Sequence, residues 1–191
     1  MKEPYIVLDI ETTGLSRHTN KITEIAAIKV VNNKIRDEFQ TLINPEVKIP
    51  LFITRLTGID DKMVRDSPPI REVMPSLLNF LKGNPIVAHC ASFDHGFLNH
   101  NAQLHLSKDL VNKKICTRKL SRRLIPTLRS YKLSSICEHF QIKNKLAHRA
   151  MPDVEVTHKI FNHLTNLMET KGINNMEHIL HFQDQSISKC N

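Results

Sequence analysis

The chain lacks long apolar runs and closely spaced cysteines, and these absences narrow the class of protein. No stretch of about 18 apolar residues occurs in the sequence, so we expect no membrane-spanning helix. We also expect no signal peptide, because an apolar strand already begins at Tyr5. The four cysteines form no Cys-x-x-Cys pair. Such spacing argues against a zinc site and a disulfide framework, and it is typical of the reducing cytoplasm, where we expect the protein to work.

Acidic residues are outnumbered by basic ones, since 19 Asp and Glu against 27 Lys and Arg give a formal net charge of +8. A basic protein attracts polyanions, among which nucleic acid is the commonest partner. Nine of the basic residues lie between Lys108 and Lys132, where the one acidic residue is Asp109. This segment is either a solvated helix face or a surface that contacts phosphate groups, and its composition fits both.

The order of the apolar segments predicts a single α/β domain with a mixed sheet. With 191 residues and 40% hydrophobic content, the chain suffices for one substantial core but not for two typical domains. Strands are expected from Tyr5, over residues 21–31 and over 35–43, with a tight turn at Asn32-Asn33 between the last two, and then a short buried strand at 86–88. Helices are expected around residues 73–81, 93–104, 133–140, 156–167 and 176–182, and residues 45–69 are expected to form a long connection.

Two carboxylates end the first apolar run. In a strand, side chains alternate between faces, so Asp9 and Glu11 are expected to project to the same side. Two buried carboxylates repel each other unless a cation lies between them, and Mg²⁺ binds through a few carboxylates plus substrate phosphate oxygens. Together with Asp94, Asp153 and the nearby His148, they suit a two-metal site that cleaves phosphodiester bonds.

Three segments that carry these residues point to a known family. They are residues 9–15 (DIETTGL), residues 86–94 (IVAHCASFD) and residues 148–153 (HRAMPD). On these motifs, the chain resembles the DEDDh 3′–5′ exonucleases, and most closely the epsilon proofreading subunit of bacterial DNA polymerase III and its relatives. A familiar intermediate segment at residues 53–59 (ITRLTGI) extends the resemblance, which covers about residues 4 to 168.

The resemblance implies a ribonuclease-H-like fold, with an exonuclease domain over residues 1–170 and a short C-terminal helix and tail over 171–191. It implies two Mg²⁺ or Mn²⁺ ions, one held by Asp9, Glu11 and Asp153 and the other by Asp9 with Asp94. His148 is implied as the general base that takes the proton of the attacking water. The activity implied is stepwise hydrolysis of DNA from its 3′ end to nucleoside 5′-monophosphates, with a polymerase as a possible partner.

Substrate contacts are also implied by the resemblance. The residues concerned are Thr12 and Thr13 at the terminal nucleotide, Leu56 and Thr57 beside its sugar and base, and His89 and Phe93 in the same pocket. Plain core packing is an equal alternative for Leu56 and Phe93. Taken singly, Asp94 and Asp153 also fit helix starts, where a carboxylate is favoured electrostatically.

Two positions depart from the family pattern. Cys90 stands where the family usually has Asn, which removes a hydrogen-bonding amide beside the second motif but no metal ligand. Met151-Pro152 replaces the acidic or small residues common before the third-motif aspartate, and a slight shift of the helix start is expected there.

Three other functions compete with DNA proofreading. RNA-trimming exonucleases of the same superfamily share the five catalytic residues, so these motifs do not separate DNA from RNA. A catalytically silent nucleic-acid-binding module is expected to lose at least one carboxylate, and none is missing here. A zinc hydrolase needs a closely spaced His or Cys ligand set, which the sequence lacks.

Overall fold

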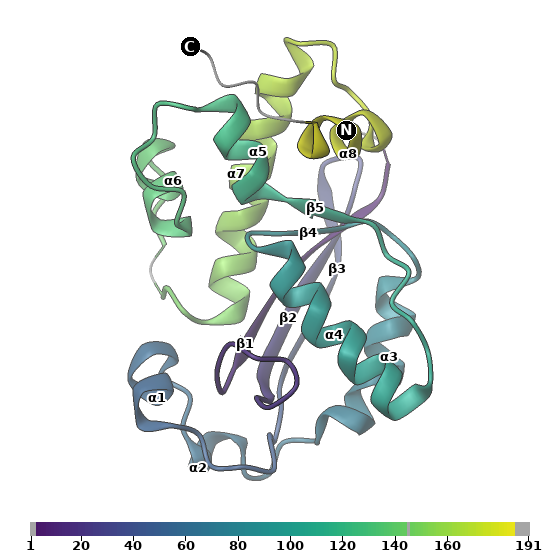
Figure 1. Ribbon diagram of the computed structural model, residues 1–191, viewed down its shortest axis with the longest axis vertical. Coiled ribbons are helices and arrows are strands. Elements are labelled where there is room, and N and C mark those ends of the chain that lie inside the picture. The colour runs from purple at the N-terminus through teal and green to yellow at the C-terminus, as the bar shows by residue number, and fades with distance from the viewer. Residues whose placement is uncertain (1–2, 145, 186–191) are drawn as a thin grey trace.

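The computed structural model describes residues 3–144 and 146–185, so the end of the expected C-terminal tail, with Cys190, lies outside the described residues. A five-stranded sheet with the strand order β3-β2-β1-β4-β5 forms its centre (Figure 1). β1 pairs antiparallel with β2 and parallel with β4. The mixed α/β sheet expected from the sequence is confirmed. The strands are β1 (Tyr5–Thr12), β2 (Ile22–Val31), β3 (Lys34–Leu42), β4 (Ile86–Ala88) and β5 (Lys114–Cys116).

Helices cover both faces of the sheet (Figure 1). α5, α6, α7 and α8 contribute to one hydrophobic cluster, and α3 and α4 contribute to another. No helix among the described residues is both long and apolar enough to cross a membrane. The helices are α1 (Leu51–Thr57), α2 (Asp61–Val64), α3 (Ile70–Leu81), α4 (Ala91–Leu106), α5 (Thr117–Leu124), α6 (Leu133–His139), α7 (Ala150–Glu169) and α8 (Met176–Asp184).

β1 is apolar on both faces because it lies in the middle of the sheet. Tyr5 and Val7 pack into the cluster on the α7 side, whereas Ile6 and Leu8 pack into the cluster on the α3–α4 side. A strand with both faces covered by helices is expected to show such a continuous apolar run. Asp9 follows Val7 by two positions, so strand alternation places its side chain on the α7 side.

The hairpin between β2 and β3 forms at the expected turn. Asn32 and Asn33 adopt φ angles of 53° and 57°, in the left-handed region that a two-residue hairpin turn requires. The long connection expected over residues 45–69 is wrong in part, because it contains α1 and α2. These short helices pack in a small separate cluster around Ile53 and Ile59, so they carry too few buried positions to give a periodic apolar pattern.

The basic segment contains a helix, α5, and also a strand, β5, that was not expected from the sequence. In contrast, the short helix expected near the C-terminus is present as α8. Met176 and Ile179 of α8 are buried in the same cluster as α7. The Gln183 side chain accepts a hydrogen bond from the Cys116 backbone N–H (2.9 Å) and donates one to the Lys114 carbonyl (2.7 Å), which ties α8 to the edge strand β5.

Candidate active site

Three of the four predicted metal ligands converge at one point. Ligand oxygens of Asp9, Glu11 and Asp153 all lie within 4.8 Å of one another. Asp9 and Glu11 share a face of β1, and Asp153 lies in the first turn of α7, which packs on that face. The structure therefore brings together residues that are more than 140 positions apart in the sequence, as the strand alternation and the third motif predict.

Asp94 lies beside this cluster, in the first turn of α4. Its side chain is 3% exposed, and the Ile10 backbone N–H donates a hydrogen bond to its carboxylate. Burial raises the pKa of Asp94 to about 7, although this hydrogen bond and one from its own backbone oppose the shift. The charge of Asp94 in turn raises the pKa of Asp9, so the two carboxylates are electrostatic neighbours.

The clustered acids hold protons more tightly than ordinary carboxyl groups. Burial, followed by the charges of Asp153, Glu24 and Asp94, raises the pKa of Glu11 to about 8. Burial and the neighbouring carboxylates, with Asp94 first among them, raise the pKa of Asp9 well above its usual range. Near neutral pH the cluster thus favours protons or cations, which is the electrostatic condition of a cation site.

Asp153 is held in one orientation by two donors. Nδ2 of Asn144 donates to Oδ1 (2.6 Å), and the His148 backbone N–H donates to Oδ2 (3.2 Å). His148 has a φ of 65°, a left-handed conformation that is uncommon outside glycine. This backbone bend turns the His148 N–H toward Asp153, so the loop before α7 both presents the histidine and orients the carboxylate.

A buried ion pair that the sequence reading missed anchors this loop to the sheet. Nε and Nη2 of Arg149 donate to the two oxygens of Glu24 (3.0 and 2.9 Å), and the Ala150 backbone N–H also donates to Glu24 (3.0 Å). The Glu24 side chain is 1% exposed and lies opposite Glu11 in the β1–β2 register. Its position was detectable in principle, because a lone glutamate in an apolar strand must find a partner.

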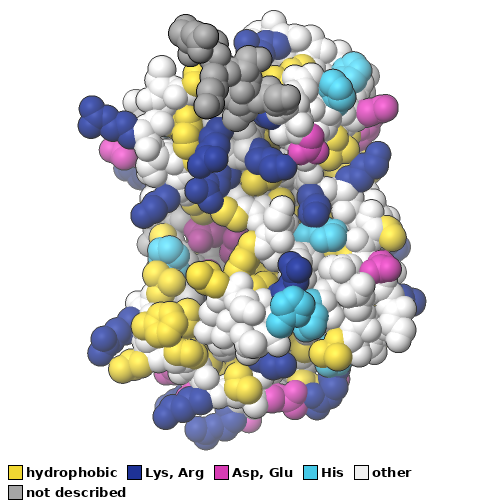
Figure 2. Space-filling model, in the orientation of Figure 1, with side chains coloured by type: hydrophobic (Ala, Val, Ile, Leu, Met, Phe, Trp, Pro, Cys, Tyr) yellow, Lys and Arg dark blue, Asp and Glu magenta, His cyan; other side chains and the backbone are white. Residues whose placement is uncertain are grey.

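A cleft of about 890 Å³ opens beside Asp153. In Figure 2, Asp and Glu side chains form the floor of the hollow on the left, between apolar side chains below and Lys and Arg side chains above. Predicted residues His148, Leu56 and His89 line this cleft, and the Leu56 side chain is half exposed there. The remaining lining residues come mainly from α6 and its flanks: Cys90, Arg118, Tyr131, Lys132, Leu133, Ser134, Cys137, Glu138, Ile142, Asn144 and Ala147.

His89 is held in place on the cleft wall. One ring nitrogen bonds to the Thr117 hydroxyl (3.0 Å) and the other to the Tyr131 carbonyl (3.0 Å). Burial lowers the pKa of His89 to about 4, so its ring is neutral at physiological pH. Both ring nitrogens of His89 are therefore engaged, whereas among residues 3–144 and 146–185 no hydrogen bond holds the ring of the exposed His148.

The three predicted threonines form local hydrogen bonds. Thr12 donates to the Gly14 carbonyl (2.7 Å), and Thr13 accepts from the Lys21 N–H (2.9 Å), so both brace the loop after β1. Thr57 is buried, and its hydroxyl donates to the Ile53 carbonyl (3.0 Å) and accepts from the Ile59 N–H (3.1 Å). Phe93 lies outside the cleft, in two adjoining hollows. Substrate roles for these residues therefore stay predictions.

Comparison with known proteins decides the family. A family model described as Exonuclease, of the RNase T type, matches residues 6–161. The chain belongs to the exonuclease family. Members of this family are nucleases that hydrolyse phosphodiester bonds. The resemblance drawn from the three motifs is confirmed at this level.

Two bacterial DNA polymerase III proteins are similar in sequence to this chain. The chain is 43% identical over 175 residues to a DNA polymerase III PolC-type of Caldanaerobacter subterraneus subsp. tengcongensis, which covers 92% of this chain but 12% of that protein. It is 35% identical over 157 residues to the DNA polymerase III subunit epsilon of Aquifex aeolicus, covering 82% of this chain and 78% of that subunit. The chain thus spans about an eighth of the PolC-type relative and most of the epsilon subunit.

Solved structures of exonucleases share the fold. Exonuclease X in complex with 5′ overhanging duplex DNA superposes with a TM-score of 0.69 at 26% identity, covering 94% of this chain and 99% of that one. Exonuclease I of E. coli in complex with a dT13 oligonucleotide superposes with a TM-score of 0.77 at 16% identity, covering 95% of this chain and 46% of that one. The second likeness shows the fold alone.

Proposed function

We propose that this exonuclease-family chain hydrolyses DNA from the 3′ end in a metal-dependent, two-ion reaction that releases nucleoside 5′-monophosphates. The observation that carries the proposal is the convergence of Asp9, Glu11 and Asp153, with Asp94 buried beside Asp9. Four acids from three segments in one small volume have no packing role that would outweigh their mutual repulsion. This assembly also argues against a catalytically silent binding module.

The donor set fits hard divalent cations. All four side chains offer carboxylate oxygens, the ligand type preferred by Mg²⁺ and Mn²⁺, and no His or Cys joins the cluster within the described residues. The guanidinium of Arg149, whose charge acts on Glu11, is already paired with Glu24. When bound, divalent ions would lower the pKa of the attacking water and stabilise the charge that develops on the phosphate.

The protein side chains supply position and proton transfer. Asn144 and the His148 backbone orient Asp153, and the Glu24–Arg149 pair fixes the start of α7 relative to β1 and β2. We assign to the exposed His148 side chain the role of general base, because it borders the cleft next to Asp153. Leu56 offers an apolar surface to the terminal base or sugar.

DNA is the proposed substrate and a replicative polymerase the proposed partner. This rests on the relatives named as DNA polymerase III, both the PolC-type and the epsilon subunit, which also favour action in the bacterial cytoplasm. Within the chain, we assign residues 1–170 to the exonuclease domain and residues 171–191 to a short C-terminal segment whose helix α8 docks on that domain.

The test is digestion of end-labelled oligonucleotides with Mg²⁺. We expect 5′-labelled DNA to shorten stepwise from its 3′ end with release of nucleoside 5′-monophosphates, and a circular single strand to resist. RNA of the same sequence, run in parallel, tests the substrate class. Nicking of the circle would contradict exonuclease action, and faster digestion of the RNA strand would replace the DNA proposal with RNA trimming.

A further inference from the structure

Three hollows lie next to one another on the face that carries α4 and α5. The first, of about 670 Å³, is lined by Leu15, Cys90, Ser92, Phe93, Cys116, Arg118, Lys119 and Arg122. The second, of about 240 Å³, is lined by Leu15, Ser16, Arg17, His18, Ser92, Phe93 and Phe97. The third, of about 400 Å³, is lined by Arg17, His18, Ser92, His95, Gly96, Asn99, His100, Gln103 and Lys114.

Shared lining residues make these hollows continuous with the catalytic cleft. Arg118 borders both the cleft and the first hollow. Phe93 borders the first and second hollows, and Arg17 borders the second and third. We call the three hollows together the basic track. A chain molecule whose end occupies the cleft can therefore continue along the track without leaving the protein surface.

The charge of the basic track has one sign. None of its lining residues is acidic, and within residues 3–144 and 146–185 no ion pair engages Arg17, Lys114, Arg118 or Arg122. Figure 2 shows Lys, Arg and His side chains across the middle of this face. Burial, and then the positive charges of neighbouring His, Lys and Arg side chains, lower the pKa of His100, which is the response expected in a positive field.

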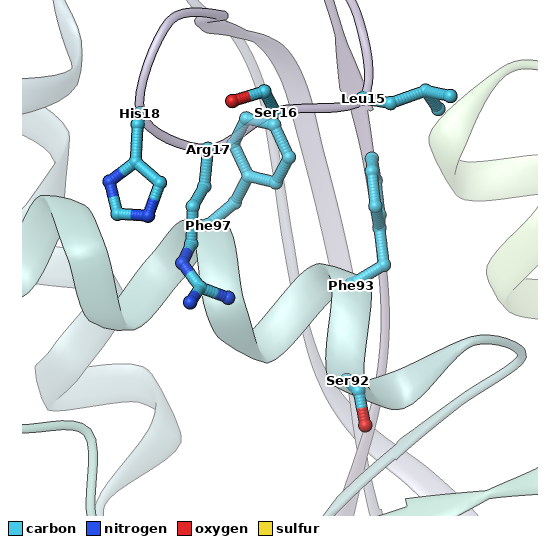
Figure 3. A pocket seen from close by; sticks show the side chains of 7 residues that line it. All are labelled: Leu15, Ser16, Arg17, His18, Ser92, Phe93 and Phe97. Atoms are coloured by element: carbon cyan, nitrogen blue, oxygen red, sulfur yellow. The ribbon is translucent and has the colours of Figure 1, made fainter.

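The second hollow combines this charge with apolar and aromatic side chains. Figure 3 shows Leu15 and Phe93 on one side, and Arg17 and His18 extending from the loop toward α4 on the other. Leu15 is 87% exposed. Arg17 lies close over α4, since a Cβ added at Gly96 would lie 2.9 Å from its Nη1. The exposed Leu15 and the half-buried Phe93 give a strand an apolar surface beside these cations. Grooves that bind single strands commonly combine positive charge with aromatic side chains.

We propose that the basic track binds the phosphodiester backbone of nucleic acid outside the catalytic cleft, so that the natural substrate is a strand or duplex much longer than the cleft holds. The proposal rests on the proposed function for the identity of the bound polymer. Arg17 and Lys114, which no ion pair engages in the described part of the chain, contact phosphates at the far end of the track, and Arg118 continues the contacts to the cleft. The digested strand and a strand paired with it both carry such backbone phosphates, so either could occupy the track.

The experiment compares substrates that reach the track with one that does not. The variant Arg17→Gln/Lys114→Gln removes two exposed charges of the track, and Lys34→Gln/Arg36→Gln removes two exposed charges of β3, which line none of the hollows. Each variant is assayed on a thymidine dinucleotide, a single strand of about 20 nucleotides, and a hairpin duplex with a recessed 3′ end. Fluorescence anisotropy with labelled forms of both long substrates measures binding without turnover.

We expect the track variant to raise KM and the dissociation constant for a long substrate roughly 5- to 30-fold at low salt. The slope of log affinity against log salt should become shallower by about 0.7 for each lost single-strand contact. Kinetics on the dinucleotide should not change, and the β3 variant should match the wild type. Weaker binding of the 20-mer by the track variant would show that the track contacts the digested strand. Weaker binding of the hairpin alone would show that it contacts the paired strand.

Unchanged binding of both long substrates, or an equal loss in the β3 variant, would overturn the proposal. A wild-type protein that cleaves no substrate would refute the proposed function instead. The anisotropy arm would still decide whether the track binds nucleic acid.

Discussion

Replacing Arg149 by Met tests whether the buried ion pair holds the active site together. Methionine keeps much of the apolar stem but removes the guanidinium that donates twice to Glu24. The Glu24 carboxylate, 1% exposed, then keeps the Ala150 N–H (3.0 Å) and the Gln40 amide (3.3 Å) as its remaining donors. Removing one partner of a buried ion pair typically costs about 3–5 kcal/mol.

We expect the lower part of that range, about 3 kcal/mol, because the Arg149 side chain is 31% exposed and the site admits some water. For a domain of this size, such a loss lowers the melting temperature by roughly 6–12 °C. Chemical unfolding in EDTA, followed by circular dichroism, measures the loss of unfolding free energy without interference from metals. Glu24→Gln is the matched variant, and it should cost about 1–2 kcal/mol because the partly exposed Arg149 can be hydrated.

The double variant and the pH dependence sharpen the test. Glu24→Gln/Arg149→Met should be more stable than Arg149→Met alone, because it no longer buries an unpaired charge. In the wild type, burial opposes ionisation of Glu24, but hydrogen bonds from Arg149 and Ala150 lower its pKa below the usual value. Its stabilising contribution is thus complete above a pH of about 4.5 and lost as pH falls through the lowered folded pKa.

In Arg149→Met, burial and the neighbouring acids should instead raise the pKa of Glu24. The stability deficit relative to wild type should therefore be full above this raised pKa and shrink as the pH falls from there through about 4.5. An Arg149→Met protein within 1 kcal/mol of wild type at pH 7, or a double variant less stable than Arg149→Met, would refute the reasoning.

Other predictions concern the carboxylates and the proton acceptor. The folded pKa values of Glu11 and Asp94 are raised to about 8 and 7. Their contribution to stability is therefore full below a pH of about 4 and is lost as the pH rises to 8. In EDTA, the melting temperature should fall over this pH range. Scanning fluorimetry should show Mg²⁺ or Mn²⁺ restoring stability most at pH 8, and a flat profile in EDTA would contradict it. Asp94→Asn should abolish cleavage while raising the melting temperature at pH 8 in EDTA; cleavage at wild-type rates would remove Asp94 from the site. Asn144→Ala should raise the metal concentration needed for half-maximal activity by about 10-fold, since it frees one oxygen of a ligand carboxylate, and an unchanged metal titration would count against this. His148→Gln should lower kcat by about 10²- to 10⁴-fold with DNA binding unchanged, as measured by single-turnover kinetics, and full activity would assign the base elsewhere.

Local periodicity was enough to place the four acidic residues on their own strand or helices. The alternation along β1 placed Asp9 and Glu11 on one face, and the helical segments after residues 90 and 149 placed Asp94 and Asp153 in first turns. These features depend on neighbours within a few residues, and the backbone geometry of a strand or helix sets them directly. Periodicity does not show which distant residues meet, and the resemblance of the three motifs to a known family supplied that information.

Tertiary structure alone decided what surrounds those acids. The Glu24–Arg149 pair joins residues 125 positions apart, and no local pattern specifies such a partner. The packing of α1, α4 and α5 likewise decides three further features. It buries Thr57, places Phe93 outside the cleft and makes the basic track continuous. Alternation and helical periodicity determine which way a side chain points from its own element, whereas its partner and its burial depend on elements that meet it only after the chain folds.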